Sequence, residues 1–288
     1  MTTASPARLA LARTFLFVPG DRTERHARAL ASGAGAVIVD LEDAVAPERK
    51  HAARTQIADS FAALPGEAHG RLLVRVNACD TPWHADDRAL VGRLAAQGLL
   101  AGVVLPKAER GADLAALAGV VGPGVALLPL IESVAGMDAA DVLAAAPQVL
   151  RLVFGHLDFQ ADAGLACGPD EAELVPVRLA LVLASRRAGL VPPVDGITSD
   201  WRDAQRLGAD SLRARRGGFG AKLCIHPEQV ATVQSAFTPS ADELAWARRV
   251  CDAVRAAGGG VVAVDGRMVD GPVVKLAERL LAQEVTIG

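Results

Sequence analysis

The stretch "TFLFVPGDRTERHARALASGAGAVIVDLED" (residues 14–43) contains the repeating unit from which the fold is predicted. An apolar run (14–19) is followed by an Arg/Ala/Leu-rich segment with helical spacing and then by a second apolar run (36–43). Asp21 can cap the start of the intervening helix, and Gly33 can mark its end. Neither run alternates strictly with polar residues, which is typical of parallel strands buried on both faces. The stretch therefore predicts a strand–helix–strand unit.

Six further apolar runs follow along the chain, each separated from the next by a segment with helical spacing. They span residues 71–77, 102–107, 126–132, 151–158, 193–198 and 222–227. Eight strand–helix units in 288 residues predict an α/β fold, a (β/α)8 TIM barrel, rather than an open doubly wound sheet. No glycine-rich dinucleotide or P-loop fingerprint follows the first strand, which argues against the usual open-sheet nucleotide binders.

The chain continues well beyond its eighth predicted strand. Ser240 and Glu243 have the spacing of a capping box at a helix start, and a triple glycine ends that helix. A short extended piece and a last amphipathic helix follow. We therefore expect residues 1–238 to form the barrel and residues 239–288 to form a C-terminal helical extension that the barrel does not need for closure.

Composition excludes several classes of function. The net charge is −3, aromatic residues make up 3% of the chain, and no basic stripe is interleaved with aromatic residues, so nucleic acid is not an expected partner. The four cysteines include no C-x-x-C pair, which argues against zinc and against a disulfide framework. Arg8 and Arg13 interrupt the apolar residues near the N-terminus, so no signal peptide or membrane partner is expected. These features predict a cytoplasmic protein.

Polar side chains gather at the predicted C-terminal ends of the strands, where barrels of this kind carry their catalytic groups. Seven of the eight strands end in this way, with Asp40, Glu42, Asp43, Arg75, Asn77, Lys107, Glu132, Asp158, Asp195 and His226. Buried charges are costly unless they are paired or bind a metal. This end of the barrel must therefore neutralise its own charges or hold a cation.

Glu132 and Asp158 end neighbouring predicted strands, which lie roughly 4.8 Å apart. Two carboxylates at that separation favour a cation between them. Because no His or Cys stands at ligand spacing, the pair indicates an oxygen-only site for Mg²⁺. The alternative is that either carboxylate forms a salt bridge with Lys107 or Arg75.

Arg75 is suited to gripping a carboxylate or enolate oxygen with two parallel hydrogen bonds. It can also form a salt bridge with the acids of "DLED" (40–43), and both roles can hold together. Asp40 and Asp43 are interpreted as groups that orient Arg75 and metal-bound waters. The remaining polar end residues Lys107, Asp195 and His226 are interpreted, from their positions alone, as structural.

Eight motifs together resemble the citrate lyase β-subunit-like/malyl-CoA lyase family of the HpcH/HpaI aldolase superfamily. They are "FLFVPGDRTERHARAL" (15–30), "VIVDLEDAVAPERK" (37–50), "VRVN" (74–77), "VLPKAE" (104–109), "LIES" (130–133), "FGHLDF" (154–159), "KLCIHPEQV" (222–230) and "DGRMVDGPVV" (265–274). The resemblance covers almost the whole chain in the same order. It implies Mg²⁺ and the cleavage or formation of a carbon–carbon bond between a CoA thioester enolate and a 2-oxo acid.

The resemblance also implies a role for individual residues. Glu132 and Asp158 become the metal ligands, with Glu132 beside the substrate, and Arg75 becomes a catalytic substrate clamp. Phe17, Arg25 and Arg28 are expected near the CoA or substrate entrance, and Ile225 and His226 against the acyl part. Asp270 is expected to be the catalytic acid/base, donated into a neighbouring subunit's active site by the extension in a homotrimer or hexamer.

The chain departs from the family pattern at a few positions. Leu157 stands where many members have an acidic residue, and Glu24 and Arg28 stand where some relatives have lysines. These departures leave the acyl group open.

The expected function is therefore a Mg²⁺-dependent lyase on a citramalyl-, malyl- or citryl-CoA-like hydroxyacyl-CoA, giving an acyl-CoA and an oxo acid. The first alternative is a metal-dependent aldolase on a free 2-oxo-hydroxy acid. A second alternative, of another class, is a non-catalytic assembly subunit.

Overall fold

The computed structural model describes residues 5–258 and 260–285. It divides into two compact units, one ending at Gln234 and one beginning at Ser235. This division lies within helix α12 (Gln229–Phe237), a few residues before the boundary at 238 that the sequence predicts. Each unit is described by itself.

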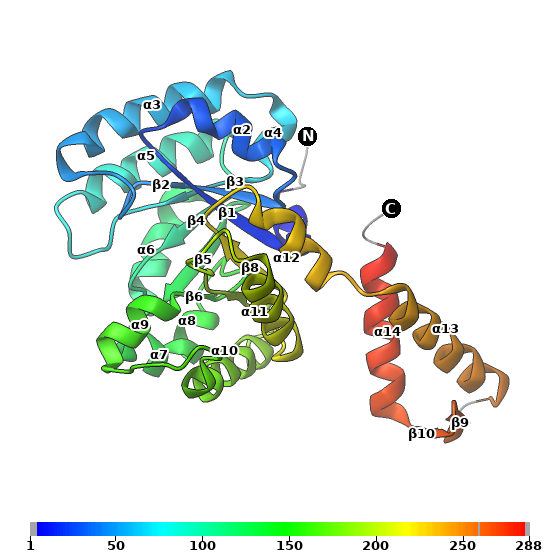
Figure 1. The fold of residues 1–288 in the computed structure, drawn as a ribbon. Coiled ribbons are helices and arrows are strands. Elements are labelled where there is room, and N and C mark those ends of the chain that lie inside the picture. The colour runs from blue at the N-terminus through cyan, green and yellow to red at the C-terminus, as the bar shows by residue number, and fades with distance from the viewer. Residues whose placement is uncertain (1–4, 259, 286–288) are drawn as a thin grey trace. The chain divides into compact units, whose positions relative to one another are not determined.

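The first unit is a closed barrel of eight parallel strands in the order β1 to β8 (Figure 1). The strands are β1 (Thr14–Pro19), β2 (Ala36–Asp40), β3 (Leu72–Arg75), β4 (Gly102–Leu105), β5 (Ala126–Ile131), β6 (Val153–Phe154), β7 (Val194–Asp195) and β8 (Ala221–Cys224). The pairing of β1 with β8 closes the barrel. This architecture confirms the predicted (β/α)8 fold.

Helices cover the outside of the barrel (Figure 1). The α-helices of this unit are α1 (Ser5–Leu11), α2 (His26–Ala31), α3 (Lys50–Ala63), α4 (Gly66–His69), α5 (His84–Ala96), α6 (Gly111–Val121), α7 (Val134–Asp138), α8 (Ala140–Ala144), α9 (His156–Ala163), α10 (Val175–Arg187), α11 (Ala204–Arg216) and α12. Short 3-10 helices are η1 (Thr23–Arg25), η2 (Pro47–Arg49) and η3 (Ala172–Leu174). Among the described residues, no helix has the length and hydropathy needed to cross a membrane.

The helix after β1 begins differently from the sequence prediction. Its first turn is the 3-10 helix η1, and Asp21 does not cap it. Instead, the Asp21 carboxylate lies 2.9 Å from Nη1 of Arg49, because a cationic partner from another segment satisfies it more strongly than a backbone N–H. Gly33 follows the end of α2 with φ of +81°, as predicted for a glycine past a helix end.

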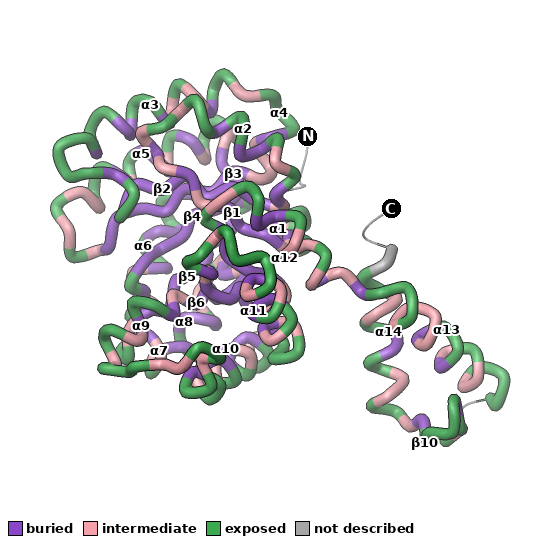
Figure 2. Tube along the Cα trace, viewed as in Figure 1, coloured by how far each residue is buried: buried purple, intermediate pink, exposed green. Residues whose placement is uncertain are grey.

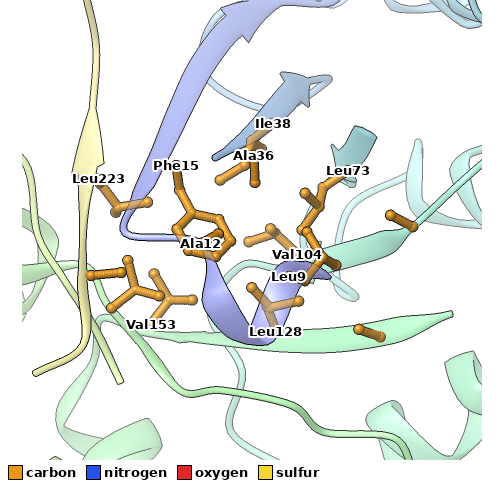
Figure 3. Close-up of a cluster of buried hydrophobic side chains, with 14 of the residues drawn as sticks. Leu9, Ala12, Phe15, Ala36, Ile38, Leu73, Val104, Leu128, Val153 and Leu223 are labelled. Carbon is orange, nitrogen blue, oxygen red and sulfur yellow. The ribbon is translucent and has the colours of Figure 1, made fainter. Parts of the chain in front are cut away.

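The barrel interior is filled by apolar side chains from every strand, and Figure 2 shows the strands of the barrel coloured as buried. Figure 3 shows Leu9 of α1 packed with Phe15, Leu73 and Leu128 inside the barrel. A Cβ at Gly102 would lie 2.9 Å from the carbonyl oxygen of Ala126, so this close approach requires glycine. The packed interior leaves the ends of the strands to form any site.

The second unit consists of α13 (Ala241–Ala256), α14 (Gly271–Val285) and an antiparallel pair, β9 (Val262–Val264) and β10 (Arg267–Val269). Ser240 and Glu243 form the predicted capping box. Helices α13 and α14 enclose a small apolar core around Ala247, Val250 and Ala277.

Candidate active site

A cavity of about 490 Å³ lies at the C-terminal ends of the strands, where the sequence predicts the site. Its wall draws on β1, β2, β3, β5, β6 and β8 and on the start of α9. It brings together seven of the predicted residues: Phe17, Asp40, Asp43, Arg75, Glu132, Asp158 and Ile225. These residues come from segments far apart in the sequence, so the barrel alone makes them neighbours.

The sixth strand is much shorter than predicted, which changes the position of Asp158. The sequence predicts a strand over 151–158, but β6 ends at Phe154 and α9 begins at His156. Asp158 therefore lies in the first turn of a helix rather than at a strand end. A carboxylate is stabilised there by the partial positive charge of the helix N-terminus. The pattern of hydrophobic residues alone does not predict that this helix begins so early.

Glu132 follows β5 directly and is buried, with 4% of its surface exposed. Its Oε1 accepts a hydrogen bond of 2.8 Å from the backbone N–H of Lys107, a residue with φ of +44°. Burial raises the pKa of Glu132 to about 8, and the negative charges of Glu42 and Asp158 add to the rise. Neighbouring negative charge thus disfavours the ionised form of this carboxylate.

This electrostatic setting fits a bound divalent cation. Glu132 and Asp158 face the same cavity, and the hydrogen bond from the backbone N–H of Lys107 engages Oε1 of Glu132 rather than Oε2. A cation between the two would offset the repulsion that raises the pKa of Glu132. The described residues include no cluster of three or more His, Cys, Asp and Glu side chains able to hold a metal ion, so the ion that fits is one that fills its shell with water and substrate oxygens, as Mg²⁺ does.

Arg75 ends β3 and is held on several sides. Its Nε and Nη2 donate hydrogen bonds of 2.7 and 2.6 Å to the two carboxylate oxygens of Asp40, and its guanidinium lies 4.8 Å from the ring centre of Phe17. Arg75 thus forms the salt bridge with "DLED" that the sequence allows, and it also lines the cavity. Asp40 occupies its bidentate edge. The remaining N–H groups, which a substrate would have to reach, lie near Glu42 (2.8 Å from Nη1) and Asp43 (3.5 Å from Nη2).

Glu42 belongs to the same charged group, although the sequence assigned it no specific role. Its Oε2 lies 2.8 Å from Nη1 of Arg75 but lacks hydrogen-bond geometry with any described group. Burial raises the pKa of Glu42 to about 7, despite the opposing charge of Arg75. The raised pKa of Glu42 follows only from its buried position beside Arg75 and Glu132, because in the sequence it is simply one of the three acids of "DLED".

Four predicted residues lie outside the cavity lining. Arg25 and Arg28 are exposed on η1 and α2, and His226 stacks on Trp201 with ring centres 4.0 Å apart. Asp270 is half-buried before α14 in the second unit.

A buried ionic cluster that no local pattern in the sequence predicts supports one side of the cavity. His156, at the start of α9, lines the cavity and points Nε2 at Glu171, 3.4 Å away. Glu171 also pairs with Arg178 and with Arg213, and Arg178 donates a 3.0 Å hydrogen bond to Asp195. Burial alone would raise the pKa of Glu171, but hydrogen bonds from His156 and Arg178 outweigh it and hold this pKa below its usual range.

Comparison with known proteins identifies the family. A model of the HpcH/HpaI aldolase/citrate lyase family matches residues 13–227. A citrate lyase subunit beta-like protein of Deinococcus radiodurans is 36% identical over 284 residues, covering 96% of this chain and 98% of the relative. A (3S)-malyl-CoA thioesterase of Cereibacter sphaeroides is 33% identical over 278 residues, covering 96% of this chain and 95% of the relative.

A solved structure of a related protein also matches this chain. The CitE protein of Mycobacterium tuberculosis, in complex with magnesium, acetoacetate and coenzyme A, has a TM-score of 0.81 and 36% identity, covering 94% of this chain and 97% of that one. The resemblance carried by the eight motifs is thereby confirmed. The chain belongs to the HpcH/HpaI aldolase/citrate lyase family.

Proposed function

We propose that this protein is a Mg²⁺-dependent carbon–carbon lyase that cleaves a hydroxyacyl-CoA thioester into an acyl-CoA and a 2-oxo acid. The observation that carries the proposal is the carboxylate pair, Glu132 and Asp158, facing one cavity together with Arg75. The family and the ligands named for the CitE complex, magnesium, acetoacetate and coenzyme A, support it.

Glu132 and Asp158 would hold the metal ion, and Asp40 would keep the guanidinium of Arg75 in place through its two hydrogen bonds. When bound, Mg²⁺ supplies Lewis-acid stabilisation of the negative charge that develops on the substrate oxygens. Arg75 would donate the N–H groups that Asp40 does not use to the same developing charge. Such preorganised donors act strongly here because the side chains around them are buried.

The cleavage itself is a balanced step without a redox partner. The substrate hydroxyl gives its proton to solvent, the carbon–oxygen bond becomes the carbonyl of the oxo acid, and the bond to the neighbouring methylene breaks. Its electron pair passes to the thioester enolate, which takes up a proton at carbon to give the acyl-CoA. In this proposal Asp270 of a neighbouring subunit exchanges that proton, and the protein assembles as a trimer or hexamer.

A second candidate is a metal-dependent aldolase that acts on a free 2-oxo-hydroxy acid. The carboxylate pair and Arg75 would serve this reaction equally well, and it would need no contacts from Arg25 or Arg28 to CoA phosphates. The intact carboxylate pair argues against a non-catalytic assembly subunit.

Thermal unfolding with ligands separates these candidates. A ligand that binds only the folded protein stabilises it by about 2.7 kcal/mol at a hundred times its Kd. We expect Mg²⁺ with acetyl-CoA or propionyl-CoA to raise the Tm of the wild type, and Glu132→Ala to abolish that shift. A shift with pyruvate or glyoxylate alone, and none with any CoA thioester, would instead identify the aldolase.

A product assay completes the test. Incubation of a hydroxyacyl-CoA with the protein and Mg²⁺ should yield acyl-CoA and oxo acid in equal amounts. Release of free CoA thiol without oxo acid would show thioester hydrolysis, the reaction in the name of the C. sphaeroides relative, and would overturn the lyase proposal.

A further inference from the structure

Lys50, the first residue of α3, is buried beside the turn that follows β2, with 4% of its surface exposed. An ammonium group has three N–H donors, and Nζ of Lys50 contacts three acceptors. They are the carbonyl oxygens of Leu41 and Glu42, at 2.6 and 2.7 Å, and Oδ1 of Asn77, at 2.7 Å. All three acceptors are neutral, so the charge of Lys50 strengthens its hold on backbone and amide oxygens rather than on a carboxylate.

These acceptors belong to the ends of two neighbouring strands. The parallel pairing of β2 with β3 ends at Asp40 and Arg75, and the backbone N–H of Leu41 then donates to the carbonyl of Arg75 at 2.9 Å. Beyond this point Lys50 continues the connection, because its two carbonyl partners follow β2 and Asn77 follows β3. One buried ammonium group thus ties together the two strand ends from which Arg75 and its carboxylate partner project.

Asn77 is itself held in place, so it gives Lys50 a fixed support. Its Nδ2 and its backbone N–H donate to Oδ2 of Asp87 at 2.6 and 2.7 Å, and Oδ1 of Asp87 accepts from Nε of Arg54 at 2.7 Å. All three side chains are buried. These bonds orient the amide of Asn77 so that its oxygen faces Lys50. The network therefore gives a place to a strand-end residue that the sequence singles out without a role.

The turn after β2 connects Lys50 to Arg75. Within the turn, the backbone N–H groups of Glu42 and Ala44 donate to the two carboxylate oxygens of Asp40 at 2.9 and 3.2 Å. The same carboxylate accepts the two hydrogen bonds from Arg75. Lys50 holds the carbonyl groups of this turn, and the N–H groups of the turn hold Asp40. A displaced turn would therefore move the Asp40 carboxylate and the guanidinium together.

We propose that Lys50 is a positioning residue for Arg75, which it holds through the turn after β2 and through Asn77. The inference rests on the proposed function in one respect, that Arg75 grips the carboxylate of an oxo acid, and the lyase and the aldolase share this role. Glu132 follows β5 and Asp158 lies in α9, so the proposed metal ligands come from elements outside this network. Lys50 accordingly controls the binding of the oxo acid and not the binding of Mg²⁺.

Two calorimetric titrations of the full chain test this assignment, one with Mg²⁺ and one with pyruvate at saturating Mg²⁺. Lys50→Met removes the ammonium group and keeps an unbranched side chain. We expect it to weaken pyruvate binding at least about tenfold, the cost of a misplaced charge-assisted hydrogen bond, and to leave Mg²⁺ affinity and stoichiometry unchanged. Asn77→Ala removes only the β3 end of the bridge and should weaken pyruvate binding less. It tests the same bridge if Lys50→Met does not fold.

A double variant and a matched control make the test specific. If Lys50 acts through Arg75, Lys50→Met should weaken pyruvate binding no further in the Arg75→Ala background. Lys222→Met is the control, because Lys222 is also buried but donates to the carbonyl of Gly196. It should leave both affinities unchanged, since the turn after β2 keeps its lysine.

Three outcomes would overturn the proposal. Wild-type pyruvate affinity in Lys50→Met, or an equal loss in the presence and absence of Arg75, would show that Lys50 does not act through Arg75. A fall in Mg²⁺ affinity or stoichiometry equal to the loss of pyruvate binding would show a merely structural role. In both cases the proposed function stands. If the wild type binds no pyruvate or other oxo acid with Mg²⁺, the proposed function fails and takes this inference with it.

Discussion

Gly155 is a single residue that determines where the carboxylates of Glu132 and Asp158 lie relative to each other. Gly155 lies beside Glu132, and a Cβ built on Gly155 would be 2.6 Å from both Cβ and Oε2 of Glu132. No real side chain tolerates such a distance, so this glycine sets the position of the Glu132 carboxylate. It also joins β6 to α9 and thereby places Asp158.

Gly155→Ala should displace Glu132 and weaken metal binding by about 10–100-fold, the range found when groups that position a metal ligand are changed. Calorimetric titration with Mg²⁺ or Mn²⁺ would measure the loss. Gly119→Ala is the matched control, because a Cβ there meets nothing within 4 Å. Equal metal affinity in both variants would contradict the role of Gly155.

His26 illustrates a residue-scale effect on stability. It is fully buried, its Nδ1 lies 2.9 Å from Oγ of Ser60, and within the described part of the chain its Nε2 has no hydrogen-bond partner. Burial lowers the pKa of His26, so the folded state holds the neutral ring. The unfolded chain takes up the proton near pH 6.5, and it therefore gains stability relative to the folded state as pH falls below that value.

The neutral ring of His26 should accordingly leave the free energy of unfolding unaffected above about pH 6.5 and should lower it as the pH falls below that value. At pH 5.5 the loss from His26 is at most about 1.4 kcal/mol. Urea unfolding of wild type and His26→Gln between pH 7.5 and 5.5 would measure it, with the variant showing the flatter profile. Parallel profiles would rule out a buried neutral His26.

At the scale of elements, the cluster around Glu171 ties the loop before α10 to α9, α10 and α11. Glu171 accepts from Arg178 of α10 and Arg213 of α11, and His156 at the start of α9 points at it. One carboxylate thus connects three helices beside the cavity. Helix α9 carries Asp158, so this cluster also fixes the direction of its first turn.

Glu171→Gln should lower the free energy of unfolding by about 3 kcal/mol, because it removes the charge that compensates two arginines in a largely buried cluster. Chemical denaturation would measure the change. The control is Glu24→Gln, whose ion pair with Arg22 is exposed and should make no measurable difference. A loss as small as that of the control would show that the cluster contributes no net stability.

At the scale of the whole molecule, the chain has two units with separate cores. The cavity lining comes entirely from the first unit, and the proposed acid/base Asp270 belongs to the second. If the extension completes a neighbour's site, the carboxylate pair of one active site and its Asp270 come from different chains.

Mixing two inactive proteins should then restore activity. Glu132→Ala lacks a proposed metal ligand and Asp270→Asn lacks the proposed acid/base, but co-refolded mixed oligomers contain some sites with both groups intact. Random mixing in a closed ring gives about one quarter of the wild-type activity per site. The lyase assay would measure it, and Glu132→Ala mixed with Glu132→Ala is the control. Activity of Asp270→Asn alone, or none in the mixture, would contradict donation between subunits.

The sequence by itself determined the barrel and predicted several of the residues that line its cavity. Hydrophobic runs and helical spacing are local, and eight strand–helix units permit few other arrangements. The strand ends then named Glu132 and Arg75, because parallel strands bring their C-terminal ends to the same face. The same logic selected Asp158, although the residue proved to lie in a helix.

Only the tertiary structure decided which polar groups meet. Several features depend on how segments far apart in the chain pack. They are the ionic cluster of Glu171, Arg178 and His156, the raised pKa of Glu42, and the positions of Arg25 and Arg28 outside the cavity. The bridge that Lys50 makes between the ends of β2 and β3 depends on which strands are adjacent in the closed barrel. Burial and charge–charge distances are properties of that packing, and no local pattern in a sequence encodes them.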